Sequence, residues 1–119
     1  MSKVMIHNTR GKDDTERATL AFVVGNAALS SDQEATLLLT LEGVWWATRG
    51  YADGQQAEGF APIQEVMATF IKNGGKIWVC GACTKPRNIT PEQLIEGAQT
   101  VGAATAVEAM INGAHTLSF

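Results

Sequence analysis

The feature that most constrains the fold is an alternation of strand-like and helix-like segments along the chain. Short apolar runs of strand length recur between segments whose apolar residues are three or four positions apart, as on one face of a helix. This order predicts a parallel sheet covered by helices on both faces, because each parallel strand needs a crossover connection before the next. We therefore expect a three-layer α/β/α domain with a mainly parallel sheet.

The elements expected from these patterns fall at regular intervals. The expected strands are Lys3–His7, Ala35–Leu41, Ile77–Val79, Ala98–Val101 and His115–Phe119. The long helices are expected from a capping box at Asp13 and Glu16 to Ser30, from Pro62 to a stop at Asn73, and from Ala103 to Ile111. Shorter helical turns are expected after Gly43 and from Thr90 to Ile95.

Composition sets the class of protein and excludes others. A chain of 119 residues with 45% hydrophobic residues fits one globular domain, residues 1–119, that needs no disulfide or metal to hold a core. A net charge of −3 argues against a nucleic-acid partner, which needs a basic face. No apolar stretch approaches the ~20 residues of a membrane span, and the first residues are typical of neither a signal peptide nor an anchor, so we expect a cytoplasmic location.

Three segments are expected to meet at one edge of the sheet. Ligands of such sheets collect beyond the carboxyl ends of the strands, where loops and helix N-termini converge. Asn8–Lys12, Glu42–Trp46 and Cys80–Arg87 all follow expected strands. They define one candidate site.

Both cysteines of the chain, Cys80 and Cys83, lie in the last of these segments. In a cytosolic chain, two thiols separated by two residues are more often reactive or metal-binding than structural. A reactive cysteine works as the thiolate and needs surroundings that lower its pKa, which Lys85 and Arg87 could provide. We favour Cys83 as the nucleophile because it is nearer to these cations, whereas Cys80 ends the strand.

Several alternatives remain open for the thiols. Both cysteines could be small hydrophobic residues packed in a strand-end turn. A zinc site has two cysteine ligands and at best His7 as a third, fewer than structural zinc normally has. A thioredoxin-type dithiol has the right spacing, but Pro86 and Asn88 interrupt the long helix that such a motif requires.

The other candidate residues also have two interpretations each. Glu42 could be a general base or acid at a sulfur site, or only a charge at a helix N-terminus. Of Trp45 and Trp46, one is expected to pack inward and the other to face a pocket or a neighbouring subunit. A competing function is a binding module for a small anionic or nucleotide-like ligand, in which the thiols take no part. The residues important for binding would then be Lys12, Arg10 and Arg49.

Most of the chain resembles one known family. The stretches "GGKIWVCGACTKPRNI", "LIEGAQTVG" and "HTLSF", with "LEGVWWATRGYADG" and "PIQEVMATFIKNGG" upstream, are similar to the DsrE/DsrF-like sulfur-relay family, in particular its small YchN-like members. Asn88 stands where the family commonly has glycine, and asparagine also tolerates a left-handed backbone.

The resemblance implies a fold and a function. It implies a five-stranded α/β/α fold, assembly into trimers or hexamers, and a persulfide on Cys83, with Cys80 as the first thiol of the motif and Arg87 as its arginine. The activity implied is that of a sulfur carrier or a sulfurtransferase, with sulfur donor and acceptor proteins as partners and no metal or organic cofactor. The adjacent tryptophans and few charges of Gly43–Ala47 would also suit a subunit contact. The residues expected at the substrate are Arg87, Lys85, Thr9, Arg10, Glu42 and Trp45.

Overall fold

The computed structural model describes residues 1–119 and contains one five-stranded sheet. The strands are β1 (Lys3–Asn8), β2 (Glu34–Leu39), β3 (Lys76–Cys80), β4 (Ala98–Val101) and β5 (Ala114–Ser118). Their order across the sheet is β4-β3-β2-β1-β5, and every pair is parallel. The predicted parallel α/β architecture is confirmed, with the cysteines at the end of a near-central strand.

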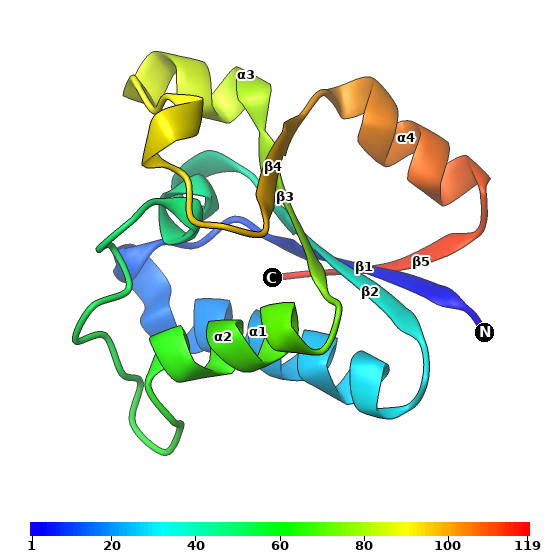
Figure 1. The fold of residues 1–119 in the computed structure, drawn as a ribbon, viewed down its shortest axis with the longest axis horizontal. Helices are drawn as coiled ribbons and strands as arrows, with labels where there is room; N and C mark the ends of the chain where they lie inside the picture. The colour runs from blue at the N-terminus through cyan, green and yellow to red at the C-terminus, as the bar shows by residue number, and fades with distance from the viewer.

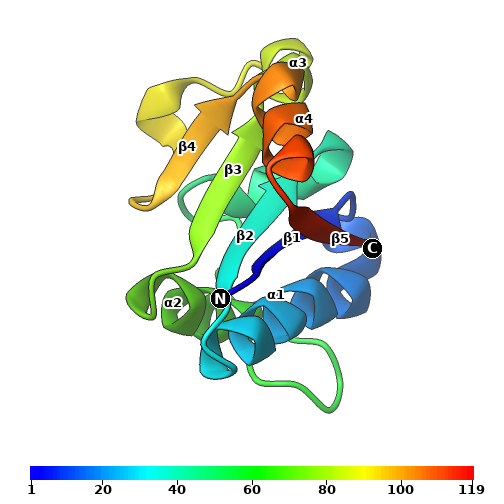
Figure 2. The same ribbon diagram turned by 90° about the vertical axis from the view of Figure 1, so that its right-hand side faces the viewer.

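Helices lie on both faces of this sheet (Figure 1). The α-helices are α1 (Thr15–Ser30), α2 (Ile63–Lys72), α3 (Gly81–Thr84) and α4 (Ala103–Ile111), and the 3-10 turns are η1 (Lys12–Asp14), η2 (Leu41–Ala47), η3 (Lys85–Arg87) and η4 (Pro91–Gln93). Helices α1 and α2 cover one face, and α4 lies over the other (Figure 2). None of these helices combines the length and the apolar character needed to cross a bilayer.

The start of α1 differs from the expected capping box. Asp14, not Asp13, is the N-cap, and its side chain accepts a hydrogen bond from the backbone N–H of Arg17. The carboxylate of Asp13 instead accepts the backbone N–H of Gly11 at 2.7 Å, closing the preceding turn. Sequence spacing alone did not separate these two adjacent carboxylates.

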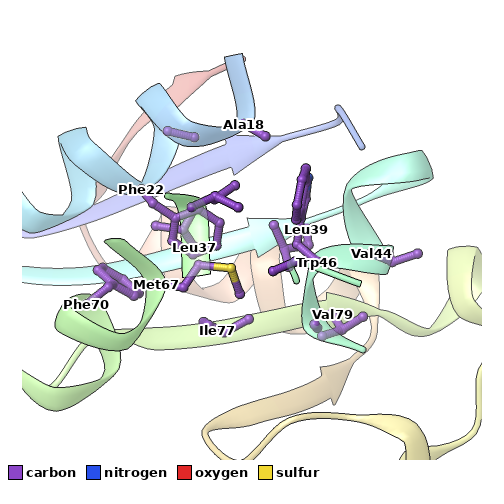
Figure 3. Packing of buried hydrophobic residues seen from close by; sticks show 14 of the residues in the cluster. Ala18, Phe22, Leu37, Leu39, Val44, Trp46, Met67, Phe70, Ile77 and Val79 are labelled. Carbon is purple, nitrogen blue, oxygen red and sulfur yellow. The ribbon is translucent and has the colours of Figure 1, made fainter. Parts of the chain in front are cut away.

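The core lies between the sheet and the α1/α2 layer. Alternate residues of β2 and β3, Leu37, Leu39, Ile77 and Val79, point toward Phe22 of α1 and Phe70 of α2 (Figure 3). The two phenylalanine rings meet edge to face with centroids 5.9 Å apart. Complete burial of side chains of this size contributes about 1.5–3 kcal/mol each, so this layer accounts for most of the fold's hydrophobic stabilisation.

The opposite face of the sheet is covered less completely. No residue of α4 is buried, and Leu38 and Trp78 remain only partly buried on the sheet beneath it. Three apolar side chains of α4, Val107, Met110 and Ile111, are 48%, 44% and 78% exposed. Since they lie three and four positions apart, they form one stripe on the helix, which we call the α4 stripe.

Strand β2 ends two residues earlier than its apolar run suggests. Leu41, expected as the last strand residue, has a left-handed backbone with φ of 52° and is 54% exposed. Such a conformation is rare for a bulky residue and turns the chain sharply into η2. Two residues later, a Cβ on Gly43 would lie 2.4 Å from the carbonyl oxygen of Asn8, so only glycine fits where η2 passes the end of β1.

Candidate functional site

The two cysteines lie where β3 passes into α3. Cys80 is the last residue of β3, and Cys83 follows one helical turn later in α3. Both are free thiols of intermediate exposure. The helix does not continue beyond this region, because the short turn η3 follows and ends at Asn88, whose φ is 56°. The expectation that asparagine supports a left-handed turn here is confirmed.

Arg87 joins this turn to the segment after β2. Its Nε donates to Oε2 of Glu42 at 2.8 Å, and one terminal nitrogen donates to the backbone carbonyl of Cys83 at 3.0 Å. The arginine is mostly buried and the glutamate half exposed, with 24% and 53% of their side-chain surfaces accessible. The ion pair therefore fixes the position of the cysteine turn against η2.

The thiol of Cys83 does not have the lowered pKa expected from the nearby cations. Burial raises the pKa of Cys83, and the adjacent Cys80 thiol raises it further, whereas the backbone N–H of Leu41 and the charge of Arg87 lower it without outweighing these effects. Lys85 is exposed, forms no ion pair, and does not shift the Cys83 pKa. The prediction of a low-pKa thiol was therefore wrong: burial outweighs the cations, one of which points to solvent.

Three further predicted residues lie at this edge but serve the fold. Thr9 donates from its hydroxyl to the carbonyl of Phe119 at 2.9 Å. Arg10 forms an exposed ion pair with Asp13 at 3.3 Å. The ring of Trp45 stacks on Tyr51 with centroids 6.0 Å apart. None of the three makes a hydrogen bond or ion pair with the cysteine turn.

The segment expected at a subunit contact contributes three side chains to the core. Within Gly43–Ala47, the side chains of Val44, Trp46 and Ala47 are completely buried. The indole Nε1 of Trp46 donates to the carbonyl of Arg10 at 2.6 Å. The inward tryptophan was predicted, and Trp45 remains only partly buried.

Two residues near the thiols were missed by the sequence analysis. Leu41 brings its backbone N–H to Cys83, and Thr40 follows the last residue of β2 at the same edge. The direction of a backbone N–H, such as that of Leu41, cannot be predicted from the residue type. A threonine after an apolar run, such as Thr40, is too common to indicate a functional site.

Two cavities of the molecule have linings that do not include the cysteines. The larger, about 460 Å³, is a groove between α4 and the amino-terminal ends of the strands, with Trp78 and Lys76 on its sheet side and Glu108 on α4. The other, about 190 Å³, lies between α2 and the loop after η2. No group of three or more His, Cys, Asp or Glu side chains is close enough to hold a metal ion, so the zinc interpretation lacks a ligand set.

The fold and the site together define the class of protein. It is a small parallel α/β protein with two free thiols, Cys80 and Cys83, at the carboxyl edge of its sheet. The sequence profile of the DsrE/DsrF-like family matches residues 2–119. The chain therefore belongs to the DsrE/DsrF-like family, which is associated in general with sulfur relay.

Similar proteins support the same assignment. The uncharacterized proteins MJ0760 of Methanocaldococcus jannaschii and MK0008 of Methanopyrus kandleri are 28% and 29% identical to the chain over 88% and 71% of its length. The chain spans only 38% and 66% of the lengths of these two relatives.

Two solved structures share the fold over the full length of both chains. The ychN protein of E. coli superimposes with a TM-score of 0.82 at 20% identity, and the protein of unknown function MTH1491 of Methanobacterium thermoautotrophicum with 0.80 at 15%. At such identities the likeness establishes the fold alone.

Proposed function

We propose that this chain is a sulfur-relay protein in which Cys83 accepts a sulfane sulfur as a persulfide and passes it to an acceptor thiol. The observation that carries the proposal is the turn after β3, where a partly exposed free thiol is held beside a second thiol by the Arg87 and Glu42 pair. Thiol–disulfide-type exchange supplies the chemistry, and neither a metal nor an organic cofactor is needed.

The raised pKa of Cys83 defines how such a carrier would behave. At neutral pH the resting residue is mainly a thiol, which limits its reaction with unintended electrophiles. Loading then requires that the donor or a nearby base removes the proton as the sulfur bond forms. The N–H of Leu41 and the charge of Arg87 stabilise the developing thiolate.

Uptake of sulfur is tested by mass. The purified chain is exposed to polysulfide, its intact mass is measured, and the modified peptide is mapped. We expect a gain of one sulfur atom on Cys83 in Cys80→Ser, where no second thiol can displace it, and no such gain in Cys83→Ser. If Cys80→Ser gains no sulfur on Cys83, or if the parent carries added sulfur on Cys80 alone, the proposal fails.

The alternative function is a binding module for a small anionic or nucleotide-like ligand, and the raised pKa of Cys83 favours it. A panel of such ligands is screened by thermal shift on the parent and on Cys83→Ser, because a bound ligand stabilises according to its concentration relative to its dissociation constant. A strong shift that survives the substitution supports the module over the carrier.

The proposed carrier works as a homo-oligomer, a trimer or a hexamer. The α4 stripe supports this assembly, because a helix with no buried residue and three exposed apolar side chains on one face leaves its apolar surface without a partner. The partly buried Trp78 and Leu38 extend the same surface onto the sheet. A second copy of the chain is the proposed occupant, and sulfur donor and acceptor proteins would meet the free carboxyl edge.

A further inference from the structure

His7 links three strands on the sheet face that α4 covers incompletely. Its Nε2 lies 2.6 Å from the hydroxyl of Thr40, just after β2, and its Nδ1 lies 3.3 Å from the hydroxyl of Ser118 in β5. With Nδ1–H donating to Ser118, Nε2 is left as the acceptor for the Thr40 hydroxyl. The imidazole is then a neutral base whose open nitrogen is already aimed at Thr40.

Thr40 and Cys80 each come directly after the last paired residues of β2 and β3. Strands β2 and β3 pair as far as Leu39 and Val79, and Thr40 and Cys80 are the next residues of each chain segment. Both have extended backbones, with φ of −131° and −65°. Their side chains therefore project from the same face, and adjacent strands are only about 4.8 Å apart. The hydrogen-bonded row of Ser118, His7 and Thr40 is therefore extended toward Cys80 by the register of β2 and β3.

None of the ion pairs of the molecule includes a member of this row. Burial lowers the pKa of His7, and no charged group contributes to this shift. Charged groups on neighbouring elements point elsewhere: Glu42 is paired with Arg87, and His115 is on the other face of β5. Arg10, after β1, is paired with Asp13, and Lys3, Glu34, Lys76 and Glu108 line the groove at the amino-terminal edge.

We propose that His7, acting through the Thr40 hydroxyl, accepts the proton of Cys80 and so makes Cys80 the resolving thiol of the site. This inference rests on the proposed function, since it assigns the second thiol of the same carrier. His7 and Thr40 are positioning and proton-transfer residues, and Ser118 holds the imidazole in the required tautomer. The sulfur bound to Cys83 can then leave in two ways, by transfer to an acceptor thiol or by release as hydrosulfide.

The step balances as follows in protons and electrons. The proton of Cys80 moves to Thr40 as the Thr40 proton moves to Nε2 of His7. The Cys80 thiolate attacks Sγ of the Cys83 persulfide, the bond between the two persulfide sulfurs breaks, and its electron pair leaves with hydrosulfide. The sulfane sulfur is reduced while the two cysteines are oxidised to a disulfide, which an external dithiol must reduce again.

A mixed disulfide on Cys83 tests this step without any sulfane sulfur. Dithiobis(nitrobenzoate) modifies Cys83 and releases one coloured thiolate, and attack by Cys80 on the mixed disulfide releases a second. We expect the second release at neutral pH to slow by roughly tenfold or more in Thr40→Val and in His7→Gln, because each loses the proton acceptor. Thr40→Ser keeps the hydroxyl and should keep the parent rate.

The pH dependence separates proton transfer from a structural effect. In the parent, the second release should rise with pH through the lowered pKa of His7, below 6.5, and then level off, because only neutral imidazole accepts a proton. In Thr40→Val and His7→Gln this rise and the levelling should be absent. The first release, on Cys83, should be the same in all of them.

Two controls complete the experiment. Thr36→Val removes a hydroxyl from the same face of β2 and should leave both releases unchanged, and Cys80→Ser should show only the first release. The inference is overturned if Thr40→Val and His7→Gln keep the parent's second release, or if the parent has none. Either result is independent of whether Cys83 takes up sulfane sulfur, so failure of this step is distinguishable from failure of the carrier.

Discussion

Arg87 interacts with both a carboxylate and the cysteine turn. The carboxylate of Glu42 is 2.8 Å from Nε of Arg87, while the carbonyl of Cys83 holds another of its nitrogens. Because Glu42 offsets part of the arginine charge, the thiolate of Cys83 receives less stabilisation than an unpaired arginine would give. The ion pair is partly exposed, so its contribution to folding is small, about 0–1 kcal/mol.

Glu42→Gln should therefore activate Cys83. Without the carboxylate, the full charge of Arg87 acts on the thiolate and the pKa of Cys83 falls, which we expect to speed alkylation of Cys83 at neutral pH by about threefold. The rate is measured by mass-mapped alkylation with iodoacetamide over a range of pH.

The opposite substitution gives the matched control. Arg87→Gln should slow the same alkylation, and Glu65→Gln on α2 should leave it unchanged. An unchanged or slower rate in Glu42→Gln would show that Arg87 does not act on the thiol electrostatically.

Which residues gather at the thiols was only partly predictable from the sequence. The order of strands places Glu42, Cys83 and Arg87 at one edge, and the structure joins all three. The sequence could not show that Lys85 points to solvent or that burial dominates the pKa of Cys83. Both depend on side-chain direction and depth, which local spacing does not encode.

At the scale of elements, sequence patterns were most reliable where one strong signal marks each end. Helix α4 and strand β4 have the predicted bounds, because glycines flank the helix. The end of β2 was misplaced because an apolar run continues through Leu41, and only the left-handed turn at that residue stops the strand. Hydrophobicity does not report such a turn.

The α4 stripe carries the prediction about assembly. Replacing both Val107 and Ile111 by glutamate puts charges into the proposed contact and should convert a trimer or hexamer into a monomer at micromolar concentration, as measured by sedimentation. Leu20→Glu is the control, because this side chain is 37% exposed on α1 at the other face of the sheet. A parent that sediments only as a monomer, or a double variant that assembles like the parent, would contradict the prediction.

At the scale of the whole molecule, the two edges of the sheet have different chemistry. The carboxyl edge bears both thiols, the Arg87 and Glu42 pair and the His7 row. The amino-terminal edge bears the groove of about 460 Å³ beside α4. The parallel strand order predicted the first from the sequence, because all strands end on the same side. It could not predict the groove, which depends on how far α4 stands from the sheet.

The central claim is that Cys83 hands its sulfur to another thiol. The most direct measurement loads the chain with isotopically heavy polysulfide, removes the excess, and adds an acceptor thiol in a single turnover. The Cys80→Ser variant is used because it lacks the thiol that would displace the sulfur as hydrosulfide. We predict that the heavy sulfur disappears from the Cys83 peptide and appears in the acceptor as a persulfide in equal amount. Heavy sulfur that stays on Cys83, or that never binds it, would contradict the account.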